Sequence, residues 1–173
     1  MVFKATRNLV YSAVFIAIGI VLPMAFHSVG MGGSIFLPMH IPVLIGGLFL
    51  GWRAGLMIGL VTPILSCLLT GMPPLLPMLP IMVAELGVYG AISGLLYRQI
   101  KANLILSLVV AMLVGRVAAG LVIAFFAESL GVRVTPLIFI GAAVSKGLVG
   151  MIIQLCFVPL CVKRLEKFKL NKN

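Results

Sequence analysis

Three ionisable side chains lie inside long apolar stretches of this sequence and are its strongest candidates for chemistry. Glu85 follows the run LLPMLPIMVA, Arg116 lies in LILSLVVAMLVGRVAAGLVIAFF, and Lys146 lies in PLIFIGAAVSKGLVG. A charged group in a membrane-spanning segment costs free energy unless it is paired or faces water, so each is a functional candidate. Two cations and one carboxylate leave one surplus positive charge, which favours a ligand with a carboxylate or another anionic group.

The three charges fall at similar depths in three separate segments. Each lies about eight to ten residues below the outer end of its segment, which corresponds to roughly 12 to 15 Å at the helical rise per residue. We therefore expect them to meet in one chamber. In the alternative interpretation, Glu85 and Arg116 form a structural ion pair, which still leaves Lys146 without a partner.

Weaker candidates surround the same predicted chamber. His40 lies in the run FLPMHIPVLIGG and His27 at the outer end of the first segment, although a lone histidine is more often a packing group. Tyr89 lies one turn below Glu85, and Gln154 lies deep in the last segment. The outer segments are also rich in methionine, which can form an adaptable apolar lining. These methionines are Met24, Met31, Met39, Met72 and Met78.

Catalytic motifs are incomplete. An intramembrane serine protease needs a nucleophilic serine and a partner histidine on a later helix. Ser93 and Gly94 resemble half of such a site, but no histidine follows His40. The sequence has no HExxH motif, and one carboxylate in the apolar segments cannot supply paired acid chemistry. We expect a protein that is not an enzyme.

The cysteines indicate neither a metal site nor a disulfide framework. Cys67, Cys156 and Cys161 lie in apolar stretches without CxxC or Cys/His spacing. We interpret all three as buried packing residues.

The elements that must position these residues are membrane helices. Of the 173 residues, 62% are hydrophobic and only 9% are charged, too few to solvate a globule in water. About 20 apolar residues cross a bilayer as a helix. We predict that residues 1–173 form a single, all-α transmembrane domain, a compact bundle of six transmembrane helices. Their approximate ranges are 8–26, 35–50, 54–70, 77–97, 104–126 and 136–162.

Positive charge predicts the orientation of the bundle. The net charge of +10 could suggest nucleic acid, but the basic residues lie at segment ends and not on one solvated face among aromatic residues, so we expect no nucleic-acid partner. Most Lys and Arg fall on one side of the six predicted segments, which by the positive-inside rule places both termini in the cytoplasm. This set comprises Lys4, Arg7, Arg53, Arg98, Lys101, Lys163, Arg164, Lys167, Lys169 and Lys172.

Small residues at four-residue spacing predict close helix contacts in lipid, although such spacing also arises by chance in a chain with 19 glycines. The pairs are Ala13 and Ala17, Gly47 and Gly51, and Gly55 and Gly59. Prolines crowd the connection after the third segment and stiffen an irregular path there. That connection is either a lid over an outward pocket or a tight turn between helices.

The first segment carries a family resemblance. Residues 13–17, AVFIA, read A-x-x-x-A, which resembles the first-helix motif by which substrate-binding S components of energy-coupling factor (ECF) transporters dock on the transmembrane T subunit. The chain length, the six predicted helices, the cytoplasmic termini and the basic tail agree. So do the runs FLPMHIPVLIGG, LLTGMPPLLPMLPIMVAELGVYGAISGLLYR and KGLVGMIIQLCFVPL. The likeness covers essentially the whole chain.

The resemblance implies a multi-pass protein of the prokaryotic cell membrane that captures a vitamin or cofactor precursor outside and topples in the bilayer to release it inside. It implies as partners a T subunit and two ATPase subunits. The chain carries no P-loop and no cofactor of its own is expected, so ATP and Mg²⁺ would bind those ATPases. Ala13 and Ala17 would form the docking face. The first and third connections between helices, both on the outer side, would act as gates, through His27, Gly30, Gly32, Gly33, Gly71, Pro73 and Pro74.

The identity of the ligand stays open at this point. S components share a fold while their pockets diverge, so the resemblance does not name a ligand. The family pocket is built from the outer halves of the last three helices, where Glu85, Arg116 and Lys146 lie. The surplus positive charge favours an anionic vitamin, with pantothenate first, while pyridoxine-like, folate-like, queuosine-precursor and cobalamin-precursor ligands remain. The alternative function is a self-sufficient secondary carrier or channel that acts as a homo-oligomer.

Overall fold

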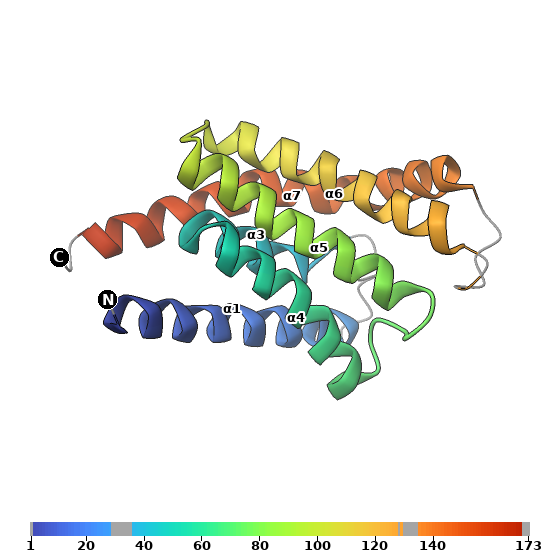
Figure 1. The fold of residues 1–173 in the computed structure, drawn as a ribbon, viewed down its shortest axis with the longest axis horizontal. Helices are drawn as coiled ribbons and strands as arrows, with labels where there is room; N and C mark the ends of the chain where they lie inside the picture. Colours follow the sequence, from blue (N-terminus) through green and yellow to red (C-terminus); the bar gives the residue numbers. More distant parts are fainter. Residues whose placement is uncertain (1, 29–35, 128, 130–134, 171–173) are drawn as a thin grey trace.

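The structure is a computed structural model, and it describes residues 2–28, 36–127, 129 and 135–170. Within these residues every regular element is a helix. The helices are α1 (Val2–Ser28), α3 (His40–Leu50), α4 (Trp52–Thr70), α5 (Met78–Gly94), the π-helix η1 (Leu95–Gln99), α6 (Leu104–Phe126) and α7 (Pro136–Leu170). Both chain ends lie at the same end of the bundle (Figure 1).

Among the described residues, five helices are long and apolar enough to cross a membrane, which agrees with the predicted all-helical membrane protein. Their candidate spans are Thr6–Phe26, Trp52–Thr70, Met78–Gln99, Leu104–Phe126 and Leu137–Phe168. The second predicted span, 35–50, has no counterpart among these five and corresponds to α3, which begins only at His40. Its 11 residues extend about 16 Å, roughly half of the hydrocarbon core of a bilayer. The count of six spans and the cytoplasmic termini stay predictions.

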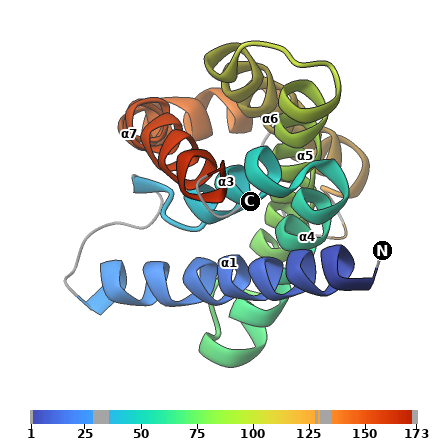
Figure 2. The same ribbon diagram turned by 90° about the vertical axis from the view of Figure 1, so that its left-hand side faces the viewer.

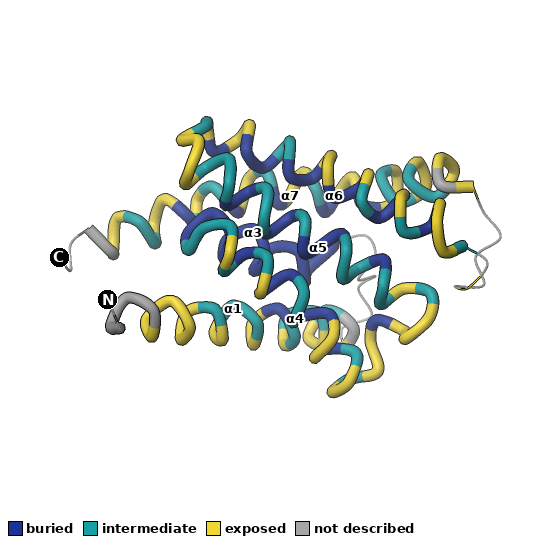
Figure 3. Tube along the Cα trace, viewed as in Figure 1, coloured by how far each residue is buried: buried dark blue, intermediate teal, exposed yellow. Residues whose placement is uncertain are grey.

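Helix α3 is the centre of the bundle and not part of its lipid-facing surface. All of its residues except Leu50 are buried, as the dark blue core of Figure 3 shows. It contacts α1, α4, α5 and α7, which surround it in the end-on view of Figure 2. A helix that is apolar on every face is typical of such a buried position. Because α3 is central, its first residue, His40, is fixed from several sides.

Glycines bring α4 and α5 into backbone contact. A methyl group at Gly55 would overlap the carbonyl of Gly90, and one at Gly59 would overlap the carbonyl of Leu86. Gly47 of α3 meets the same Gly90 carbonyl. The predicted close packing is therefore confirmed for Gly55 and Gly59. This packing fixes the position of α5 and of Glu85, which α5 carries.

The other small residues have different surroundings. Gly51 separates α3 from α4 and has a backbone φ of 100°, which residues other than glycine rarely adopt. No atom lies within 4 Å of a methyl group added at Gly51, so it makes no close helix contact there. Ala13 and Ala17 lie exposed on α1.

The three cysteines are not all buried: Cys156 is exposed, and Cys67 and Cys161 are half-buried. The prediction of three buried cysteines is therefore wrong, since apolar residues of a membrane helix also cover its lipid-facing side.

Arg98 closes the end of the bundle near the termini. Its Nε donates to the carbonyl of Leu48 and its Nη2 to that of Phe49, both at 2.8 Å. These carbonyls belong to the last turn of α3, where helix carbonyls lack intrahelical partners. Arg98 Nη2 also lies 3.1 Å from Glu166 Oε1 of α7, and the Tyr97 hydroxyl donates to Glu166 Oε2 at 3.0 Å. One side chain thus ties α3 to η1 and α7.

Replacing Arg98 with glutamine should therefore destabilise the bundle. Two carbonyl bonds and an ion pair are lost together, and we expect the free energy of unfolding to fall by about 1 to 3 kcal/mol, or roughly 5 °C in the unfolding midpoint. Thermal unfolding in detergent measures this. The matched control is Arg53→Gln, since Arg53 is exposed and its guanidinium lies over the Trp52 ring. Equal shifts for both variants would contradict the role given to Arg98.

Candidate functional site

A cavity of about 960 Å³ opens between α1, α4, α5, α6, α7 and the start of α3, which we call the main cavity. Its lining residues include Met24 in the last part of α1, Thr70 at the end of α4 and Met78 at the start of α5. These helix ends lie away from both termini in Figure 1. A volume of this order suits a small organic molecule. Its polar or charged lining residues are His40, Ser66, Thr70, Glu85, Arg116 and Lys146.

Four of the sequence-predicted residues meet in this cavity. His40 is the first residue of α3, Glu85 lies in the middle of α5, Arg116 in the middle of α6, and Lys146 in α7. Glu85, Arg116 and Lys146 thus line one cavity, as expected from the sequence, and their role in binding stays a prediction. Sequence counting works here because α5 and α6 are regular from their outer ends down to these residues.

Glu85 and Arg116 form a buried ion pair. Arg116 Nη1 lies 2.8 Å from Glu85 Oε1, and both side chains are more than nine-tenths buried. His40 Nε2 approaches the same oxygen at 3.6 Å, which is too long for a hydrogen bond. The structural pair envisaged from the sequence is thus present. It neutralises Glu85 and leaves the cavity wall with the extra positive charge of Lys146, whose side chain is exposed.

Several buried polar atoms of the cluster lack a hydrogen-bond partner. They include Nε and Nη2 of Arg116, both ring nitrogens of His40, and the hydroxyl of Tyr89. A buried group without a partner costs about 1 to 3 kcal/mol, more if it is charged. The start of α3 adds the partial positive charge of a helix N-terminus beside them. The unpartnered guanidinium nitrogens of Arg116 are therefore suited to hold an anionic or hydrogen-bond-accepting group.

Tyr89 and Gln154 support the wall from behind. The ring of Tyr89 packs edge to face on His40 with 5.2 Å between ring centres, but Tyr89 does not line the cavity. Gln154 is fully buried and its Nε2 donates to the carbonyl of Leu37 at 3.5 Å. The backbone nitrogen of His40 donates to the same carbonyl at 3.1 Å. Gln154 therefore helps to hold the turn that presents His40.

The methionine lining expected from the sequence is largely present. Met24, Met39, Met72 and Met78 line the main cavity, whereas Met31 lies outside the described residues. Met82 also lines it and was missed, because its position inside a long apolar run gives no separate signal. An apolar, deformable lining of this kind suits an uncharged ligand body.

The predicted gating residues are only partly described. Pro73 and Pro74 line the main cavity, and Gly71 ends α4 with a φ of 72°. Gly30, Gly32, Gly33 and the side chain of His27 lie outside the described residues. Gating by either loop stays a prediction.

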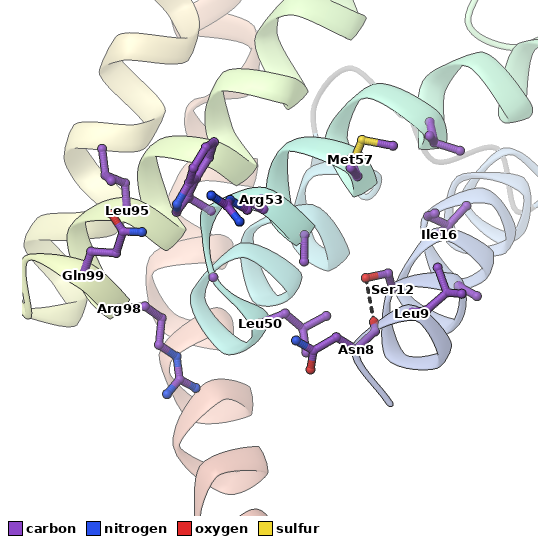
Figure 4. A pocket seen from close by; sticks show the side chains of 15 residues that line it. Asn8, Leu9, Ser12, Ile16, Leu50, Arg53, Met57, Leu95, Arg98 and Gln99 are labelled. Carbon is purple, nitrogen blue, oxygen red and sulfur yellow. Dashed lines mark hydrogen bonds between the residues drawn. The ribbon is translucent and has the colours of Figure 1, made fainter. Parts of the chain in front are cut away.

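A second hollow lies at the end of the bundle near the termini, between α1, α4 and η1. Ala13 lines it, together with Ser12, Trp52 and Arg53, and Figure 4 shows its side chains from close by. Ala17 lies one turn further along α1 and is exposed. Both residues of the predicted docking face are thus on the surface.

Sequence reasoning missed two residues beside the charged cluster. A methyl group at Gly147 would lie 3.1 Å from Arg116 Nη2 and 3.0 Å from Leu37 Cδ1, so Gly147 makes room for the guanidinium. Leu37 has a φ of 49°, a conformation that is uncommon for residues other than glycine. The only feature of the sequence that could have indicated Gly147 is its position directly after Lys146.

Comparison with known proteins gives one match. The model of the family described as "ECF transporter, substrate-specific component" matches residues 7–162 of the chain. No curated protein and no solved structure matches it.

Proposed function

The chain belongs to the substrate-specific components of ECF transporters, and from this premise we propose that it captures a small water-soluble vitamin or cofactor precursor in the main cavity. Proteins of this family are subunits of transporters and are generally not catalytic. The five long apolar helices agree with a multi-pass membrane protein. The cavity is the part of the molecule where buried polar groups and a deformable apolar lining occur together.

The observation that carries the proposal is the surplus positive charge of the cavity. Arg116 is paired with Glu85, Lys146 lines the same space, and two guanidinium nitrogens have no partner. An anionic ligand would supply the missing acceptors and the missing negative charge. The ligand class is therefore an anionic vitamin or precursor, and pantothenate is the first compound to test.

Coupling to an energised module completes the proposal. The ligand is captured outside and released inside when the chain topples in the cell membrane of a prokaryote, with both termini in the cytoplasm. A T subunit docks on the exposed Ala13 and Ala17, and two ATPase subunits bind ATP and Mg²⁺. The exposure of both alanines and the position of Ala13 at the second hollow support this docking face.

Co-purification tests the proposal. The chain is expressed with the products of neighbouring genes, and we expect it to recover a T subunit and two ATPases and to import ligand only with ATP. Import by the purified chain alone, with no T subunit recovered, would favour the self-sufficient carrier or channel instead.

Lys146 should contribute to affinity without being essential for the fold. Its charge is exposed to the cavity, so Lys146→Gln should weaken binding of the retained ligand by about tenfold. Equilibrium binding to purified protein measures this. Lys163→Gln is the matched control, because Lys163 is an exposed cation of the same helix at the other end of the bundle. Unchanged affinity in Lys146→Gln would remove this residue from the site.

A further inference from the structure

Arg98, which is exposed, and Arg116, which is buried, use the same edge of the guanidinium differently. In Arg98, Nε and Nη2 each donate to a backbone carbonyl at 2.8 Å. In Arg116, Nη1 lies on Glu85 while Nε and Nη2 are buried and have no partner. Nε and Nη2 form the edge that binds both oxygens of a carboxylate at once. Arg116 therefore keeps a two-donor edge free.

The surroundings of this edge limit what it can bind. Gly147 of α7 lies beside Nη2, and a single added methyl group would approach it to 3.1 Å. Glu85 holds the other side of the guanidinium. The space beside the free edge is thus small, and a second negative charge placed there would also face the Glu85 carboxylate.

The charges of the cavity wall also favour a ligand with a single negative charge. Within the described part of the main cavity wall, Arg116 and Lys146 carry two positive charges and Glu85 carries one negative charge. One negative charge balances the set. A phosphate monoester brings close to two negative charges near neutral pH, in addition to any carboxylate. In an apolar cavity that excess has no partner and is costly.

We propose, on the basis of the function proposed above, that the ligand is a singly charged carboxylic acid with an uncharged body. Its carboxylate accepts hydrogen bonds from Nε and Nη2 of Arg116 beside Gly147, and its body lies against the methionines and prolines of the cavity. The site therefore takes the free acid and rejects neutral analogues, dicarboxylates and phosphorylated forms of the same compound.

Gly147→Ala isolates the acid subsite without changing any charge. The added methyl group enters the space beside Arg116 Nη2 and Leu37 Cδ1, both ends of flexible side chains. Alanine is favoured over glycine inside a helix, so α7 itself gains stability. Gly141→Ala is the matched control, since Gly141 lies in the same helix and nothing is found within 4 Å of its added methyl group.

The test uses the small molecule released by denaturing the purified wild-type protein and identified by mass spectrometry. We expect one carboxylate and no other charged group, an affinity at least about tenfold lower in Gly147→Ala, and a change below twofold in Gly141→Ala. A retained molecule with two or more negative charges would overturn this inference alone, whereas a neutral or cationic molecule would also overturn the anionic ligand class proposed above. Unchanged affinity in Gly147→Ala would likewise overturn this inference alone. A wild-type protein that retains no small molecule would overturn the proposed function as well.

Discussion

Arg116→Met is expected to abolish ligand retention, with a loss of affinity of at least about 100-fold. The substitution removes the free guanidinium edge and the charge that neutralises Glu85. Equilibrium binding of the retained ligand to purified protein measures the effect. Because the change leaves a buried carboxylate without its partner, it should also cost about 3 to 5 kcal/mol of stability, which would confound the result on its own.

A double variant separates binding from folding. In Glu85→Gln with Arg116→Met, no unpaired charge stays buried, so we expect the unfolding midpoint to return toward the wild-type value. Binding should stay lost, because the guanidinium is still absent. If the double variant binds the ligand as the wild type does, the Glu85 and Arg116 pair is purely structural and the ligand is bound elsewhere in the cavity.

Ala13→Trp is expected to abolish ATP-driven uptake and leave ligand binding unchanged. Ala13 is exposed on α1 and lies at the second hollow, far along the helix from Pro23 and Met24, which line the main cavity. A bulky ring there would hold a docked helix away from α1, since small residues are what allow close approach in lipid. Uptake into cells that express the full transporter, together with binding to the purified chain, measures both quantities.

Ala124→Trp is the control for Ala13→Trp. Ala124 is an equally small, exposed residue on α6, where no docking is proposed, so uptake should persist. Normal uptake and normal recovery of the T subunit with Ala13→Trp would contradict the docking face. Equal loss of uptake in both variants would indicate a general defect in the membrane.

The charged cluster could be predicted from the sequence, whereas the role of α3 could not. Intramembrane charges are rare, and their depth in a regular helix follows from counting residues. The run that contains α3 is as apolar as a spanning segment. Hydropathy cannot distinguish a helix buried by protein from one buried by lipid, because both environments exclude water. The same ambiguity explains the wrong prediction for Cys156.

The end of α7 and the polar contacts near the termini also could not be predicted from the sequence. Helix α7 continues to Leu170, past the predicted end at 162, because a helix that leaves the membrane keeps its backbone hydrogen bonds in water. From the sequence, Arg98 contributed only to the prediction of which side of the membrane the termini lie on. Its contacts with Leu48 and Glu166 join segments far apart in the chain, and no local pattern encodes such a pairing.

The most direct test of the account is an experimental structure of the purified chain with its retained ligand bound. The account predicts ligand density in the main cavity, with an acidic group within hydrogen-bonding distance of Nε and Nη2 of Arg116 and Lys146 nearby. Ligand density outside this cavity, or a ligand in it that makes no contact with Arg116, would contradict the assignment of the site.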